Sequence, residues 1–176
     1  HYDCVFPRIA AALGACKFLF IAFAKSEEVT AAFRARLGRA FAAAGLDAED
    51  HCAILPQMPQ DMFIAAARAS DVILDTPGWS GGRSTLDLLS ADRPIVTLPG
   101  RFMRSRHTAA ILRRIGCEAT IAASLEDYVE IAVTLGRDRA RRDALARLIA
   151  ENKPRAFEDM NYIHALEDFL ERAARG

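Results

Sequence analysis

The sequence predicts an α/β fold, in which a Rossmann-like, three-layer parallel sheet is followed by a helical C-terminal tail. Short apolar runs alternate with helical patterns through residues 1–123, and helical periodicity alone continues through 124–176. Alternation of this kind is typical of parallel strands joined by right-handed crossover helices. A chain of 176 residues can bury a substantial core, so we expect a single domain over 1–176.

Five short apolar runs are the predicted strands. The first is apolar without interruption, as in strands that are buried on both faces of a sheet. The third and fourth each end in a turn rich in proline and glycine, and the fifth is weak. In chain order the predicted strands are 17–23, 52–55, 71–75, 94–98 and 119–122.

Helical spacing of apolar residues predicts the remaining elements. Ser26 can cap the second helix, and a glycine follows the first, second and fifth helices, where each should stop. The last helix carries a regular apolar stripe. The predicted helices are 3–13, 26–44, 61–69, 84–91, 101–115, 125–135, 138–152 and 158–174.

Charge and hydropathy exclude several classes of function. The formal net charge is zero, so neither nucleic acid nor an anionic membrane is the expected partner. No segment approaches the ~18 consecutive apolar residues of a transmembrane helix. The basic stretch 137–147 is interpreted as a solvated helix face, with an anion-binding stripe as the alternative.

The four cysteines predict the compartment and argue against a metal site. They are scattered without a CxxC pair, which is typical of reduced, partly buried thiols and favours the cytoplasm. They show no ligand spacing with the four histidines, so we expect no metal. The sequence has no signal-peptide pattern and begins at His1 rather than at methionine, so we expect a piece of a longer protein.

The most informative stretch is 74–87, where a buried strand ends in a glycine-rich turn and a helix begins. Its glycines permit close backbone approach and positive φ, and its hydroxyls stand beside the free N–H groups of a helix start. An arginine adds a fork of charged donors, and an aspartate one turn later could reach ribose hydroxyls. These residues, a candidate diphosphate and ribose site, are Gly81, Gly82, Arg83, Ser84, Thr85 and Asp87.

Two better-known phosphate-binding patterns are absent. No GxxxxGK[ST] motif occurs, and no GxGxxG follows the first apolar strand. Their absence argues against a P-loop NTPase and an ordinary NAD-binding domain. A plain strand-to-helix turn with an N-cap stays open as the alternative to a phosphate site.

Other candidate residues stand near predicted strand ends. Phe63 could stack on a base or pack in the core, and Trp79 could touch a ligand or pack the turn. The arginines of 101–107 could meet an acceptor or a phosphate, although solvated charges are the plainer interpretation. Asp71 and Asp75 do not form the DxD spacing of a two-aspartate phosphatase.

Four ordered segments carry a resemblance to a known family. They are 71–76 (DVILDT), 78–87 (GWSGGRSTLD), 94–100 (PIVTLPG) and 127–136 (DYVEIAVTLG). The chain resembles the O-linked N-acetylglucosamine transferase family, and above all its bacterial SPINDLY-like members. These carry tetratricopeptide repeats ahead of a GT-B glycosyltransferase region.

The resemblance implies the C-terminal lobe of a GT-B enzyme, which binds the nucleotide-sugar donor UDP-GlcNAc. The family inverts configuration, needs no metal and transfers N-acetylglucosamine to serine or threonine of proteins. Its two phosphate-contacting threonines fall on Ser84 and Thr85, or on Arg83 and Ser84, and its ribose-binding acid falls on Asp87.

Three further donor contacts of the family fall before the third strand. A ring beside the uracil falls on Phe63, where animal members have histidine, and a backbone contact to the base edge falls near Met58. A lysine near the nucleotide falls on Gln60. These departures leave open another donor, such as GDP-fucose, and a flavodoxin-like binding module without catalytic duty is the other alternative.

The resemblance also implies what the chain lacks. The N-terminal lobe, with its proposed catalytic histidine, is absent, so we expect no catalytic residue in this chain and no turnover by it alone. The first strand of the donor lobe, with a lysine that follows it, is absent too. Strand 17–23 should then pair directly with 71–75, giving the flavodoxin-like order 2-1-3-4-5, or another chain or a segment outside this sequence must fill the gap between them.

Overall fold

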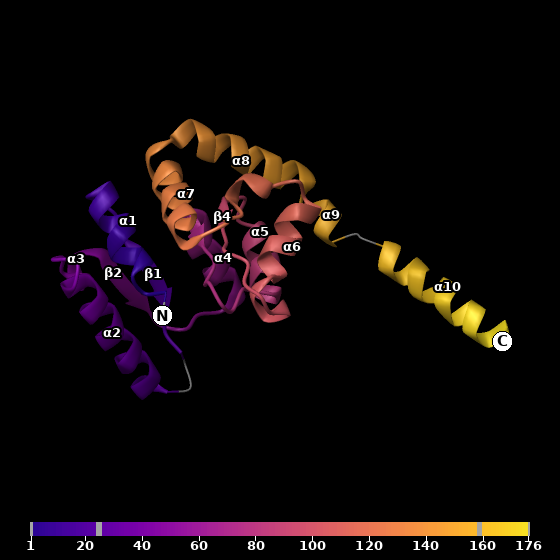
Figure 1. Ribbon diagram of the computed structural model, residues 1–176, viewed down its shortest axis with the longest axis horizontal. Helices are drawn as coiled ribbons and strands as arrows, with labels where there is room; N and C mark the ends of the chain where they lie inside the picture. Colours follow the sequence, from indigo (N-terminus) through magenta and orange to yellow (C-terminus); the bar gives the residue numbers. More distant parts are fainter. Residues whose placement is uncertain (1, 24–25, 158–159, 176) are drawn as a thin grey trace.

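The computed structural model describes residues 2–23, 26–157 and 160–175. Helices and short parallel strands alternate in the first part of the chain and helices alone follow, as the sequence predicts (Figure 1). In chain order the elements are α1 (Val5–Leu13), β1 (Phe18–Ile21), α2 (Glu27–Ala42), α3 (Ala48–His51), β2 (Cys52–Leu55), α4 (Gln60–Ala69), β3 (Ile73–Leu74), α5 (Arg83–Leu89), β4 (Ile95–Val96), η1 (Met103–Ser105), α6 (His107–Arg114), η2 (Glu118–Thr120), α7 (Leu125–Arg137), α8 (Arg139–Asn152), α9 (Pro154–Phe157) and α10 (Asn161–Arg175).

The differences from the predicted elements lie mainly at strand ends. The fifth strand is reduced to a parallel bridge between Thr97 and Ile121. The helix predicted over 101–115 begins only at His107, because a 3₁₀ turn, η1, precedes it. The prediction for 158–174 covers two residues outside the described part of the chain, and α10 begins at Asn161.

The strands form two separate parallel pairs instead of one continuous sheet. β1 pairs with β2, from Phe18 opposite Cys52 to Ile21 opposite Leu55. β3 pairs with β4, with Ile73 opposite Ile95. Within the described residues no pairing joins β1 to β3. The predicted neighbour relation in the order 2-1-3-4-5 is therefore wrong, and the three-layer sheet is present only as two halves.

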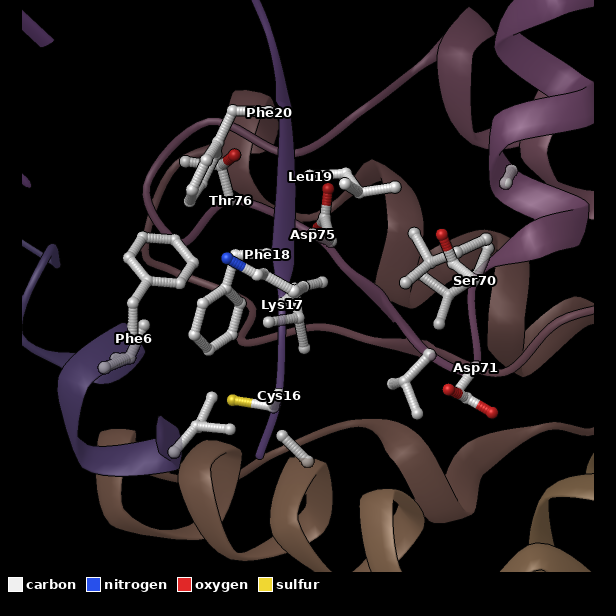
Figure 2. Close-up of a pocket in the computed structure, with 18 of the residues that line it drawn as sticks. Phe6, Cys16, Lys17, Phe18, Leu19, Phe20, Ser70, Asp71, Asp75 and Thr76 are labelled. Carbon is white, nitrogen blue, oxygen red and sulfur yellow. The ribbon is translucent and has the colours of Figure 1, made fainter. Parts of the chain in front are cut away.

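A cavity of about 1310 Å³ separates β1 from β3. In Figure 2 the Phe18 and Phe20 side chains of β1 lie on the side of Phe6, and Leu19 lies on the opposite side of the strand; Asp75 and Thr76 of the other sheet half also line the cavity. Side chains of α1 and α7 also line it. β1 and β3 line this open space from different sheets, and within the described part of the chain no ladder of hydrogen bonds joins them across it.

The backbone of both strands faces this cavity. Successive residues of a parallel strand direct their N–H and C=O groups to opposite sides. The Ala22 N–H donates to Leu55 O, so the backbone groups of Leu19 and Ile21 point away from β2. Ile73 and Asp75 donate to Pro94 O and Val96 O, so those of Leu74 point away from β4. Each sheet half thus offers an unpaired edge to the gap.

Two groups of side chains keep the halves apart and in place. An edge-to-face cluster, in which Phe6 lies 5.3 Å from Phe18 and 5.0 Å from Phe20 between ring centroids, holds α1 on β1. Beneath the other half, Tyr128 of α7 is fully buried, and its hydroxyl donates to Asp75 O over 2.9 Å. The close packing of α1 against α7 joins the two groups.

α10 projects away from the rest of the molecule, and none of its described residues is buried (Figure 1). No helix in the described residues is long and apolar enough to cross a membrane. All four cysteines are free, as predicted; Cys117 is buried and Cys16 and Cys52 are half-buried, whereas Cys4 is exposed.

Candidate functional site

The glycine turn between β3 and α5 is held from below by a carboxylate. Asp75 follows β3 directly, and its Oδ1 accepts the Gly81 N–H over 2.8 Å. Its Oδ2 accepts the Thr97 hydroxyl over 2.7 Å. Burial raises the pKa of Asp75 above the ordinary value, and these two hydrogen bonds, which favour the ionised form, oppose that effect. Asp75 therefore fixes the turn through both of its carboxylate oxygens.

A second set of hydrogen bonds ties the turn to α5 and α6. The Thr85 hydroxyl donates to Gly81 O over 2.9 Å and lies 2.8 Å from the Thr108 hydroxyl. The Thr108 hydroxyl also donates to Gly81 O, over 3.2 Å. Thr85 is only 2% exposed, so its side chain serves the turn. Arg83 and Ser84, by contrast, are exposed at the start of α5.

Of the two properties expected of Gly81 and Gly82, close approach is found at Gly81 and positive φ at neither. Positive φ was expected at Gly81 and Gly82, but of the glycines in this turn only Gly78 has it, at 87°. Gly81 is required by close approach instead, since a Cβ there would lie 2.5 Å from Thr85 Oγ1 and 2.7 Å from Ser84 Oγ. Gly82 is the N-cap of α5, and no side chain caps this helix, so the plain strand-to-helix turn with an N-cap stays an alternative to a phosphate site.

The starts of α4 and α5 meet and bring further predicted residues together. Gln60 at the first position of α4 donates its amide to Asp87 Oδ1 over 2.7 Å. The Arg83 guanidinium lies 3.9 Å from Asp87 Oδ2, one helical turn earlier in α5. The Asp87 side chain is 22% exposed and that of Arg83 is 84% exposed. A carboxylate flanked by an amide and a guanidinium therefore stands at the ligand side of the sheet.

The two remaining predicted residues lie nearby on the chain leading into α4. Phe63, one turn after Gln60, is half-buried and lines the cavity between the sheet halves. Met58 is half-buried in the loop after β2. The Phe63 N–H donates to Pro59 O over 3.0 Å, which continues the first turn of α4. Among the described residues, no hydrogen bond is recorded between either of these residues and Asp87.

Sequence reasoning missed the residues that support the turn. Ser80 is buried; its N–H donates to Arg104 O over 2.9 Å, and its hydroxyl accepts the His107 N–H over 3.0 Å. With Asp75, Thr97 and Thr108 it forms a polar network under the exposed surface. One sequence pattern could have identified two of them. Asp75 and Thr97 are polar residues that each directly follow an apolar strand, and ligands of parallel α/β folds bind at the carboxyl ends of strands.

The described residues contain no group of three or more histidine, cysteine or acidic side chains that could hold a metal ion. Burial raises the pKa of Cys52 to about 11, so this thiol is protonated at neutral pH and is a poor nucleophile. The side chains that meet beside the glycine turn are a carboxylate, an amide, an exposed hydroxyl and an exposed guanidinium, which can form hydrogen bonds and charge interactions with a ligand.

Comparisons of the chain with known proteins agree with one another. A family model described as "Glycosyl transferase family 41" matches residues 32–166. A Caenorhabditis elegans protein named UDP-N-acetylglucosamine–peptide N-acetylglucosaminyltransferase is 32% identical over 116 residues, which are 63% of this chain and 10% of that protein. An Arabidopsis thaliana protein, named as the probable enzyme of the same type, SEC, is 33% identical over 101 residues, 56% of this chain and 10% of that protein.

A solved structure is similar over almost the whole fold. A mutant of the Thermobaculum terrenum O-GlcNAc transferase superposes with a TM-score of 0.82 at 30% identity, covering 97% of this chain and 32% of that one. The chain thus spans about a tenth of the curated relatives and about a third of the solved structure.

Proposed function

The chain belongs to glycosyl transferase family 41, and from that premise we propose that it is the donor-binding lobe of an inverting protein O-GlcNAc transferase. In this proposal the enzyme transfers N-acetylglucosamine from UDP-GlcNAc to serine or threonine of proteins. The observation that carries it is the meeting of Gln60, Arg83 and Asp87 beside the glycine turn. The turn and both helix starts follow strands β2 and β3, at the edge where α/β folds bind ligands.

In this proposal the nucleoside binds at the start of α4 and at Asp87. The Asp87 carboxylate accepts ribose hydroxyls, and the Gln60 amide, which already donates to it, holds that carboxylate in orientation. The Phe63 ring packs beside the uracil, and the backbone near Met58 meets the base edge. Gln60 brings an amide but no charge, so the charge on this side of the donor comes from Arg83.

In this proposal the diphosphate binds at the exposed first turn of α5. We assign it to Arg83 and Ser84, because Thr85 is buried and its hydroxyl is engaged with Gly81 and Thr108. Gly81 and Gly82 leave the approach to these residues open. When the bond to the sugar breaks, negative charge grows on the diphosphate, and donors already fixed in place stabilise it without reorganisation. The Arg83 guanidinium adds its positive charge.

The chain supplies half of a site in this proposal. The general base that deprotonates the acceptor is in an N-terminal lobe outside the chain. A further strand of the same protein fills the cavity between β1 and β3. Both unpaired strand edges and the 1310 Å³ volume support that assignment of the cavity. The expected behaviour of the isolated chain is weak nucleotide binding and no turnover.

Calorimetry on the full-length protein, meaning the natural polypeptide that contains this chain, tests the proposal. UDP and UDP-GlcNAc should bind, and Asp87→Ala should weaken both about tenfold or more, since hydrogen bonds to a charged group contribute about 1.5–3 kcal/mol. Asp61→Ala is the matched control, because Asp61 is exposed on α4 near the same corner. GDP titrated in parallel decides the donor: tighter binding of GDP than of UDP would replace UDP-GlcNAc by a GDP-sugar. Absence of nucleotide binding would leave a non-catalytic module.

A further inference from the structure

An exposed surface beside the glycine turn combines arginines with large apolar side chains. It consists of the loop after β4 and one residue of the turn, and we name it the arginine rim: Trp79, Arg101, Phe102, Met103 and Arg104. Trp79 is 70% exposed, Phe102 55% and Met103 77%. Side chains of this size are normally withdrawn from water, so their exposure together on one edge marks an interaction surface.

The side chains of the rim are ordered by one another. The Arg104 guanidinium lies 4.7 Å from the centroid of the Phe102 ring and 5.9 Å from that of Trp79. The Arg101 guanidinium lies 5.9 Å from the Phe102 ring on the same loop. Cation–π contacts at these distances hold the arginines over the rings while their N–H groups stay available to a partner.

The backbone beneath the rim is also fixed. The loop closes on itself through Gly100 N–H to Ser105 O, at 3.2 Å, and Ser105 hydroxyl to Phe102 O, at 2.7 Å. Buried Ser80 joins this loop to the glycine turn, because both its N–H and its hydroxyl donate to Arg104 O. Hydrogen bonds therefore order the loop beneath the rim and join it to the glycine turn of the proposed donor site, residues 81–87 (the donor corner).

The rim is positively charged within a chain of zero net charge. The glycine turn and the loop after β4, residues 76–86 and 97–117, contain no aspartate or glutamate. Among the described residues no ion pair is recorded for Arg101 or Arg104. Two positioned guanidinium groups without acidic partners are complementary to carboxylates from outside the chain.

We propose that the arginine rim binds an acidic segment of the polypeptide acceptor and so favours acceptors with aspartate or glutamate near the modified hydroxyl. This inference rests on the proposed function and adds to it a substrate preference. The rim and the donor corner both follow carboxyl ends of parallel strands, so a polypeptide lying on the rim runs beside the donor. Exposed aromatic, methionine and arginine side chains are the types enriched where proteins bind proteins.

A polypeptide fits the rim better than a nucleic acid does. Base stacking needs free ring faces, and the Arg104 guanidinium already covers a face of both Phe102 and Trp79. Binding of a phosphate backbone also needs a longer track of positive charge than two arginines provide. Carboxylate side chains can reach both guanidinium groups without disturbing the contacts with the rings.

The test compares matched peptides on the full-length enzyme. One peptide carries aspartate and glutamate around the acceptor serine, and its partner carries asparagine and glutamine at the same positions. The acidic peptide should have the higher kcat/KM, and Arg101→Gln with Arg104→Gln should reduce that value about two- to fivefold per arginine, which is typical of exposed ion pairs. The neutral peptide and the KM for the donor should stay within twofold. Arg113→Gln, an exposed arginine on α6, is the control.

Charge reversal separates recognition from a structural role. Arg104→Glu should shift preference from the acidic peptide towards a lysine-flanked one, a change that loss of folding cannot produce. Equal losses on all peptides, or an unchanged preference in the glutamine variants, would overturn the inference. So would competition by a single-stranded oligonucleotide that depends on Arg104, since the rim would then bind nucleic acid.

A binding measurement keeps this result distinct from the proposed function. Fluorescence anisotropy of the labelled acidic peptide needs no transfer, and its affinity should fall in the double glutamine variant and on raising the salt concentration. Peptide binding that depends on the rim without any sugar transfer would contradict the proposed function alone. Sugar transfer with peptide binding independent of the rim would contradict this inference alone.

Discussion

The two hydroxyls at the start of α5 should differ in what they do, and their removal can show it. Thr85→Val deletes a buried hydroxyl that makes two hydrogen bonds, at 2.9 and 2.8 Å, while keeping the shape of the side chain. Each such bond contributes about 0.5–1.5 kcal/mol net, so the loss should be about 1–3 kcal/mol. The Thr108 hydroxyl keeps its bond to Gly81 O, which argues for the middle of that range.

Thermal unfolding and calorimetry with UDP on the full-length protein provide the assay. For a unit of this size 1 kcal/mol corresponds to about 2–4 °C, so Thr85→Val should lower the Tm of this lobe by about 4–8 °C. Ser84→Ala removes an exposed hydroxyl and should leave the Tm unchanged, yet weaken UDP binding about two- to tenfold. Weaker UDP binding by Thr85→Val at unchanged Tm would refute the reasoning and return the diphosphate contact to Thr85.

Three further predictions concern the support of the turn. Gln60→Ala should weaken UDP binding about two- to tenfold, because Asp87 loses the amide that orients it, and calorimetry measures this; unchanged affinity would contradict that role. Gly81→Ala should lower stability by about 1–3 kcal/mol in denaturant titration, since its Cβ would lie 2.5 Å from Thr85 Oγ1, whereas unchanged stability would mean that the turn can relax. Asp75 has a raised pKa in the folded protein, so the folded state holds its proton to higher pH and stability falls as pH rises from about 4 through that pKa. Asp75→Asn should remove that decline in unfolding measured from pH 4 to 7, and a decline that persists would assign it to another group.

The order of elements could be predicted because it depends on local patterns. Apolar runs predicted the four strands that pair, Ser26 predicted the start of α2, and Gly14 predicted the end of α1, whereas α2 ends at Ala42, earlier than the predicted 44. The helix start after Gly100 was placed too early, because hydrogen bonds of Ser105 to Phe102 turn the chain into a 3₁₀ segment first. Such contacts within one loop have no periodic signature in a sequence.

The arrangement of the strands could not be predicted, because it depends on pairing between distant segments. No residue pattern in 17–23 or 71–75 indicates that a cavity separates the facing edges of these two strands. In the site, the residue types around 81–87 were informative, but burial decides which hydroxyl is free, and burial follows from packing. Thr108, which lies 23 positions from Thr85, engages its hydroxyl.

A crystal structure of the full-length protein with UDP tests the central claim most directly. We predict that the ribose hydroxyls bind Asp87, that the diphosphate binds at Arg83 and Ser84, and that a strand of the same protein lies between β1 and β3. UDP bound away from the starts of α4 and α5, or absent from crystals grown with it in excess, would contradict the account.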